Sequence, residues 1–231
     1  MAQRNLFLAT IGALAACSSA ALAQADPQAD PALAAYRAGD IDTASRLWDA
    51  QCQSGISDIC GTLGELYEAG TDVSADLARA RGYYEMGCRG SGLSTNALPD
   101  FNACYRGGLM FANGVGGPVD GVKARHAFAV GCAGPDNDPA ALNSCNGLAQ
   151  ATRSGLGGPA DQGLALIQFT MLCYSDHAAS CMAAGDMVER AEYGPGPAPG
   201  LPEAVYAYAK ACELGEQLGC AARDRLAGEA N

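Results

Sequence analysis

The sequence is poor in basic residues. Its 231 residues contain 14 Lys and Arg against 25 Asp and Glu, which gives a formal net charge of -11. Lys and Arg form no run or stripe that could follow a phosphate backbone, so we do not expect nucleic acid as a partner. With 49% hydrophobic residues, the chain can still bury a core, and this excludes disorder as its main state.

Sequence motifs of hydrolases are also missing. Acyl-transfer enzymes that recognise penicillin carry a Ser followed three residues later by Lys. The two lysines, Lys123 and Lys210, are preceded at that spacing by Asp120 and Ala207, and no Gly-x-Ser-x-Gly segment occurs. We therefore expect a protein without catalytic residues and without a cofactor.

Only two histidines occur, and each has a structural and a catalytic interpretation. His126 lies two residues before Phe128, an expected core ring, and we interpret it as a partly exposed polar residue. His177 follows Asp176, so the two could form a general base and its orienting carboxylate. A solvated loop is the preferred interpretation of that segment.

Metal-binding patterns are weak as well. Because no Cys-x-x-Cys spacing is present and histidines are scarce, the cysteines favour disulfides over zinc. Residues 134–139 contain two aspartates, but they lack the glycine and the distal glutamate of a calcium-binding helix-loop-helix. We expect a turn there, and no metal.

The start of the chain is typical of an export signal. Arg4 is followed by an apolar run over residues 6–16 that is too short to span a bilayer. Two processing sites are open: cleavage after Ala23 would give a signal over 1–23, whereas the lipobox-like Leu-Ala-Ala-Cys at 14–17 would give a signal over 1–16 and make Cys17 a lipidation site. A short linker over 24–30 follows. Both routes predict an extracytoplasmic protein, either periplasmic or secreted, or a membrane-anchored lipoprotein, and no later segment is typical of a transmembrane helix.

The remaining ten cysteines repeat with a period. They form five pairs: Cys52 and Cys60, Cys88 and Cys104, Cys132 and Cys145, Cys173 and Cys181, Cys212 and Cys220. From one pair to the next the interval is 28 positions three times and 31 positions once. This length fits two helices of about three turns at ~1.5 Å per residue, joined by a short loop. Each interval therefore predicts an αα-hairpin.

Other positions repeat with the cysteines. Four residues before each closing cysteine is an aromatic residue, namely Trp48, Tyr84, Phe128, Phe169 and Tyr208. Eight residues before it is Ala44, Ala80, Ala124, Ala165 or Ala204, and this spacing predicts one buried stripe of a helix. Asp40, Asp76, Asp120 and Asp161 are the expected N-caps of the second helices, and Gly70, Gly114 and Gly155 the expected ends of the first helices.

These columns predict a helical repeat domain over 31–231. It comprises an opening hairpin over 31–52, hairpins over 60–88, 104–132, 145–173 and 181–212, and a capping helix over 216–228. The fourth hairpin departs from the others, because Ala191 replaces the glycine and a loop rich in Gly and Pro follows. That loop should be longer and stiffer.

Two disulfide schemes fit antiparallel hairpins. Bridges within each hairpin, such as Cys60 with Cys88, would leave Cys52 and Cys220 without partners. Pairing Cys52 with Cys60, and likewise onward, uses all ten and ties each hairpin to the next. We favour this second scheme. Closing a loop of about nine residues, as in three of the five pairs, contributes ~2 to 3 kcal/mol.

Several of these residues resemble a known repeat. The segment over 63–70 (Leu-Gly-Glu-Leu-Tyr-Glu-Ala-Gly), followed by Val73, Asp76, Ala80, Tyr83, Tyr84, Gly87 and Cys88, resembles the Sel1-like repeat, a relative of the tetratricopeptide repeat. The cysteine spacing resembles the cysteine-rich secreted bacterial branch of that family, and the resemblance extends from about residue 31 onward. The third hairpin departs from the pattern at Ala149 and Thr152. The resemblance implies an all-α, right-handed αα-hairpin solenoid stapled by disulfides.

The resemblance also implies a function. Members of this family serve mainly in protein-protein interaction, so we expect an extracytoplasmic scaffold or adaptor that binds a protein or peptide. The alternative is a weak β-lactam-binding or β-lactamase-like hydrolase, because some cysteine-rich members are linked to that activity. Arg106, Gln150 and Arg153 are the candidate partner-binding residues, since they follow opening cysteines on first helices and lie off the apolar column.

Overall fold

The computed structural model describes residues 30–89, 98–194 and 199–229. The expected signal, Cys17 and the linker up to residue 29 lie outside this part of the chain. Within it the protein has eleven helices and no strand. The helices are α1 (Pro31–Arg37), α2 (Ile41–Gln53), α3 (Ser57–Ala69), α4 (Leu77–Arg89), α5 (Phe101–Asn113), α6 (Gly121–Cys132), α7 (Pro139–Ser154), α8 (Gln162–Tyr174), α9 (Ala178–Glu189), α10 (Leu201–Glu213) and α11 (Gln217–Glu229).

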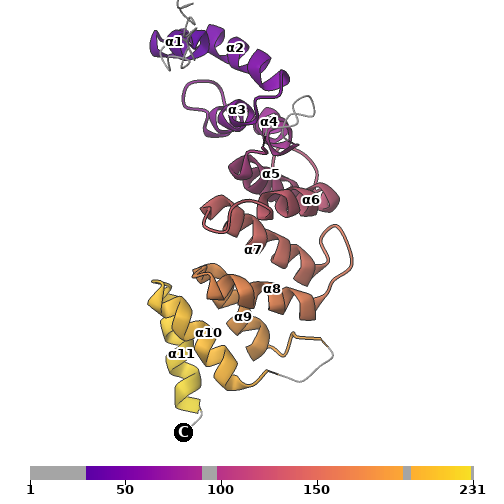
Figure 1. Cartoon of the computed structure of the whole chain (residues 1–231), viewed down its shortest axis with the longest axis vertical. Coiled ribbons are helices and arrows are strands. Elements are labelled where there is room, and N and C mark those ends of the chain that lie inside the picture. The colour runs from indigo at the N-terminus through magenta and orange to yellow at the C-terminus, as the bar shows by residue number, and fades with distance from the viewer. Residues whose placement is uncertain (1–29, 90–97, 195–198, 230–231) are drawn as a thin grey trace, which may run out of the picture.

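The helices form a solenoid. They follow one another along the long axis of the molecule in chain order, from α1 at one end to α11 at the other (Figure 1). Each helix packs mainly on its neighbours in the chain, so the contacts are local throughout. The predicted all-α hairpin solenoid is confirmed. No helix in the described ranges combines the length and the apolar composition needed to cross a membrane.

Capping residues define both ends of the inter-helix loops. Asp40, Asp76, Asp120 and Asp161 each accept a hydrogen bond from the backbone N–H three residues later, at 2.9–3.1 Å. The first helices end at Gly70, Gly114 and Gly155, whose φ angles of 65°, 69° and 79° lie in the left-handed region that favours glycine. In the fourth hairpin Ala191 occupies this region with φ 57°. The predicted caps are confirmed.

The core of each hairpin is a ring packed against small residues. All five alanines of the predicted column are completely buried. Tyr84 lies on Gly64, where an added Cβ would come within 2.5 Å of the ring, and Phe128 lies on Gly108 in the same way. A larger residue at either glycine would push the helices of the hairpin apart.

Five disulfides connect successive hairpins. They link Cys52 with Cys60, Cys88 with Cys104, Cys132 with Cys145, Cys173 with Cys181, and Cys212 with Cys220. The first helices begin before the opening cysteines, at Ser57 for α3 and at Pro139 for α7. Each bridge therefore joins the end of a second helix to the first turns of the next helix, with Cα atoms 4.4–4.8 Å apart.

Candidate functional site: the α8–α10 groove

Second helices of successive hairpins form the walls of a series of grooves. Three positions of each second helix, counted back from its closing cysteine, line or border these grooves. We name them −3, −7 and −9. The residues at these positions differ from one hairpin to the next.

 The three positions are Asp49, Ser45 and Thr43 in α2; Glu85, Arg81 and Arg79 in α4; Ala129, Arg125 and Lys123 in α6; Thr170, Leu166 and Leu164 in α8; and Ala209, Val205 and Glu203 in α10.

Opposite charges face each other across the first two grooves. Between α2 and α4, the Tyr83 hydroxyl donates to Asp49 at 2.8 Å and accepts from Nη2 of Arg79 at 3.3 Å. Between α4 and α6, Nζ of Lys123 lies 2.9 Å from a carboxylate oxygen of Glu85. Burial alone would raise the pKa of Glu85, but its bonds to Lys123 and Arg89 lower it. In both grooves an acid at −3 is thus matched by a base at −9 of the next second helix.

Arginines at −7 attach the loop of the next hairpin. Nη1 of Arg81 donates to the Pro118 carbonyl at 2.9 Å. Arg125 donates from Nε to the Leu156 carbonyl at 2.8 Å and from Nη2 to the Ala151 carbonyl at 2.7 Å. Each arginine therefore ties its second helix to the last turn of the next first helix or to the loop that follows it.

Neither the acid–base pairing of positions −3 and −9 nor the arginine at −7 is present between α8 and α10. Position −7 of α8 is Leu166, position −3 is Thr170, and position −9 of α10 is Glu203. No ion pair joins α8 to α10 in the described residues. Helix α8 has no charged residue at all. The two helices therefore border a groove that the protein's own charges do not bridge.

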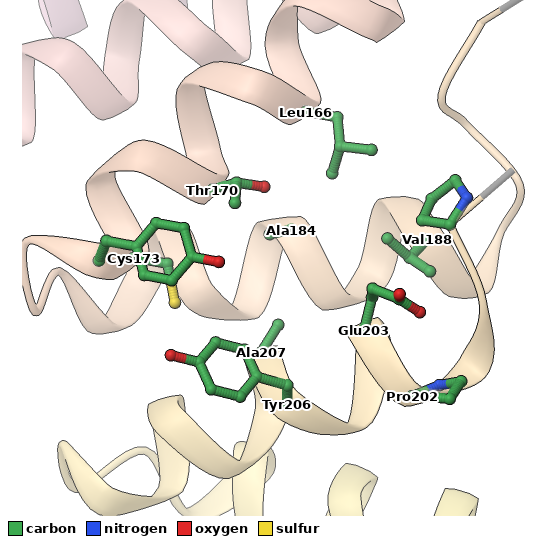
Figure 2. A pocket seen from close by; sticks show the side chains of 11 residues that line it. Leu166, Thr170, Cys173, Ala184, Val188, Pro202, Glu203, Tyr206 and Ala207 are labelled. Atoms are coloured by element: carbon green, nitrogen blue, oxygen red, sulfur yellow. The ribbon is translucent and has the colours of Figure 1, made fainter. Parts of the chain in front are cut away.

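The α8–α10 groove is an apolar cavity of about 480 Å³, against about 290 Å³ for the α4–α6 groove. It is lined by Leu166, Thr170, Cys173, Tyr174, Ala184, Val188, Pro199, Pro202, Glu203, Tyr206 and Ala207. Figure 2 shows Leu166 and Thr170 of α8 on one side, Glu203 and Tyr206 of α10 on the other, and Ala184 of α9 between them. Helix α9 therefore forms the floor of the groove.

The two helices that form the walls of the groove carry several exposed apolar side chains. Of the thirteen large hydrophobic residues that are exposed in the described chain, six lie on α8 and α10: Leu164, Ile167, Met171, Tyr174, Leu201 and Tyr206. Ile167 and Met171 are 59% and 65% exposed, and the rings of Tyr174 and Tyr206 lie 6.2 Å apart. Clusters of exposed apolar side chains often mark interaction sites.

Among the described residues, Glu203 is the one charged residue that lines the groove. Its Oε2 accepts the backbone N–H of Gly200 at 2.8 Å, which caps the start of α10. Within the described residues Glu203 takes part in no ion pair. The groove thus presents one exposed carboxylate on an otherwise apolar wall.

The candidate residues of the first helices lie elsewhere. Arg106 of α5 donates to Glu68 of α3 at 2.7 Å and to the Tyr84 hydroxyl at 2.8 Å. Arg153 of α7 lies 2.8 Å from Asp186 and 2.7 Å from Glu192 in the next hairpin. Both guanidinium groups therefore join successive hairpins within the chain. Gln150 lies on α7 and is exposed, but it does not line the α8–α10 groove.

The histidines occupy two different environments. His126 borders the α4–α6 groove. His177 caps α9: its Nδ1 lies 2.8 Å from Oγ of Ser180, and its Nε2 lies 3.1 Å from Oδ1 of Asn143. Asp176 instead pairs with Lys210 at 2.7 Å, so the structure does not bring it to His177 as an orienting carboxylate. Ser180 is completely buried, which keeps its hydroxyl away from any substrate.

Burial lowers the pKa of His177, because the neutral ring loses less solvation than the cation. In the neutral form one ring nitrogen accepts and the other donates, which suits the serine and asparagine on its two sides. The ring therefore serves as an N-cap that ties α9 to α7. Elsewhere in the described ranges, no three His, Cys, Asp or Glu side chains gather as a metal site requires.

Similarity to solved structures identifies the fold. The sequence matches no protein-family model and no curated protein. A Sel1 repeat protein from Oxalobacter formigenes superposes with a TM-score of 0.64 at 16% identity, over 83% of this chain and 77% of that one. The chain has the Sel1 repeat fold. A protective antigen of uropathogenic Escherichia coli with the same Sel1-like repeat (SLR) fold gives a TM-score of 0.62 at 16% identity, over 81% of this chain and 39% of the antigen.

Sequence reasoning located the Sel1 repeat frame but not the groove. The expected binding residues were polar and lay on first helices, whereas the exposed apolar surface lies on second helices. A signal for it was available, because the thirteen residues of α8 carry no charge and the −3 and −9 columns lose their acid and base there. Reading those columns requires knowing that successive second helices face each other.

Proposed function

We propose that this Sel1 repeat protein is an extracytoplasmic interaction scaffold and that the α8–α10 groove binds an apolar segment of its partner. The observation that carries the proposal is a groove lined by the exposed rings of Tyr174 and Tyr206, together with the exposed Ile167 and Met171 on the same wall helix, α8. Fully burying one such side chain contributes about 1.5–3 kcal/mol, so several together can offset the cost of association.

Two features support a location outside the cytoplasm. The first residues are typical of an export signal, whether it ends at residue 23 or before Cys17. Five disulfides hold the hairpins together, and such bonds persist in oxidising compartments. A periplasmic, secreted or lipid-anchored protein would each present the groove to partners in that compartment.

Site-specific photo-crosslinking in cells that naturally produce the protein tests the proposal. A photoreactive amino acid replaces either Met171, beside the α8–α10 groove, or Val122, which borders the α4–α6 groove and is 68% exposed. The two positions have similar exposure, so they differ mainly in the groove they sample.

The expected result is a discrete adduct from position 171 and none from position 122. Adding Ile167→Glu should abolish the adduct, because a charge on an exposed position of α8 disrupts the apolar surface without entering the core. The same adduct from both positions, or one that survives Ile167→Glu, would overturn the proposal.

A further inference from the structure

We infer that the segment bound in the α8–α10 groove carries a Lys or Arg next to its apolar side chains, and that this cation pairs with Glu203. The inference rests on the proposed function, because it names the chemistry of the partner at the same site. It commits to a peptide segment of another protein, apolar and basic, as the occupant.

The α4–α6 groove supplies the internal precedent. There the −9 residue of the later helix, Lys123, pairs with the −3 residue of the earlier helix, Glu85. In the α8–α10 groove the −9 residue is Glu203, and the −3 residue opposite is Thr170, which carries no charge. The position that holds an ion pair in one groove therefore holds an unpaired carboxylate in the other.

In the part of the chain that the structure describes, no Lys or Arg forms an ion pair with Glu203. The nearest basic residues along α8 to α10 are engaged: Lys210 pairs with Asp176, and Arg190 with Asp186. Arg153 also pairs with Asp186. The whole protein carries a net charge of -11, so its long-range field also attracts a basic segment.

The walls of the groove suit the stem of a basic side chain. Lys and Arg bury aliphatic stems along apolar surface while the charged group stays at the edge. Tyr174 and Tyr206 border the groove with their rings 6.2 Å apart, and a cation over a tyrosine face gains further attraction. An acidic segment would instead bring a second carboxylate to Glu203.

Selection of peptides from a random displayed library against the oxidised protein tests the inference. Groove-dependent peptides are those whose binding is lost with Ile167→Glu. We expect these peptides to be enriched in Lys or Arg beside an aliphatic or aromatic residue. Their affinity for Glu203→Gln should fall about 5-fold, as for an ion pair worth about 1 kcal/mol. Gln keeps an oxygen that can accept the Gly200 N–H, so the start of α10 is preserved.

Two further variants serve as controls. Glu213→Gln removes an exposed carboxylate from the same helix and should leave the affinity unchanged, which separates pairing with Glu203 from general attraction to an acidic protein. Thr170→Glu combined with Glu203→Lys recreates the Glu85–Lys123 arrangement across the groove. This double variant should fold and should no longer bind the peptides.

Failure of the groove as the binding site and failure of the inferred cation can be told apart. If no selected peptide depends on Ile167, the groove is not the binding site and the proposed function falls. If groove-dependent peptides lack Lys and Arg, or bind Glu203→Gln as tightly as the unchanged protein, the groove remains a site and only the inferred cation is wrong.

Discussion

The α4–α6 and α8–α10 grooves share a frame and differ in what faces across it. In both, a first helix forms the floor and a cysteine of an inter-hairpin disulfide, Cys88 or Cys173, lies in the lining. In the described residues the Glu85–Lys123 ion pair crosses the α4–α6 groove, whereas no ion pair crosses the α8–α10 groove, whose wall helix α8 carries the exposed Ile167. The frame residues thus set the fold, while a few positions outside the apolar column decide whether a groove is occupied by the protein's own side chains.

The largest expected effect tests the shared frame. Removing the bridge beside either groove, with Cys88→Ala/Cys104→Ala or Cys173→Ala/Cys181→Ala, should lower the free energy of unfolding by about 3 kcal/mol. The first pair closes a loop of sequence separation 16 and the second one of 8, so the first loss should be slightly greater. Urea unfolding of the oxidised variants measures both. A loss below about 1 kcal/mol at either site would contradict the bridge's role in holding the hairpins.

The next effect concerns Arg81 and Arg125, the arginines at position −7 that are replaced by Leu166 beside the α8–α10 groove. Arg125→Ala should cost about 2 kcal/mol, because it removes two charge-assisted bonds to partly buried backbone carbonyls. Arg81→Ala removes a single bond, which is more exposed than those of Arg125, and should cost about half as much. Urea midpoints compare them, with Arg125→Lys as the control that keeps the charge but not the paired geometry. Equal losses from the two alanine variants would contradict this ranking.

Much of the fold could be predicted, because its determinants are periodic. Alanine, ring and cysteine columns follow directly from helix geometry, and Asp120 or Gly114 have local cap roles that require no knowledge of distant residues. The site could not be predicted in the same way. Arg106 and Arg153 stay predicted partner-binding residues, but each also meets acidic residues more than thirty positions away, and nothing in a linear pattern reveals such pairing.

A smaller effect on stability distinguishes the turn at Ala191 from the turn at Gly155. Ala191 has a φ of 57°, a conformation that glycine adopts without strain. Ala191→Gly should therefore stabilise the protein by about 1 kcal/mol, and Gly155→Ala should destabilise it by about the same amount. Thermal unfolding of the two variants checks the opposed signs. Destabilisation by Ala191→Gly would show that no strain resides at this turn.

The smallest effect is a difference in pH response between two helix starts. His177 caps α9 and Asp100 caps α5, each four residues before an opening cysteine. The pKa of His177 is lowered from its ordinary 6.5 by burial, so the folded state favours the neutral ring. Its contribution to stability is complete above pH 6.5 and is lost as the pH falls through the lowered pKa.

For Asp100 the pH dependence of stability has the opposite sign. Burial raises the pKa of Asp100, so its contribution to stability is present at low pH and is lost as the pH rises through the raised pKa. Between pH 7.5 and 5.5 the protein should thus lose stability mainly through His177. His177→Asn keeps a capping side chain and should flatten this dependence. Urea midpoints at the two pH values measure it, and an unchanged slope in the variant would contradict the role of the ring.

Hydrogen exchange with and without the partner recovered by crosslinking tests the groove most directly. Binding in the α8–α10 groove predicts slower exchange at amides of α8 and α10 and in the second half of α9, with α4 and α6 unchanged. Protection confined to the first helices α5 and α7, which carry Arg106 and Arg153, would contradict it and would place the binding surface on the opposite set of helices.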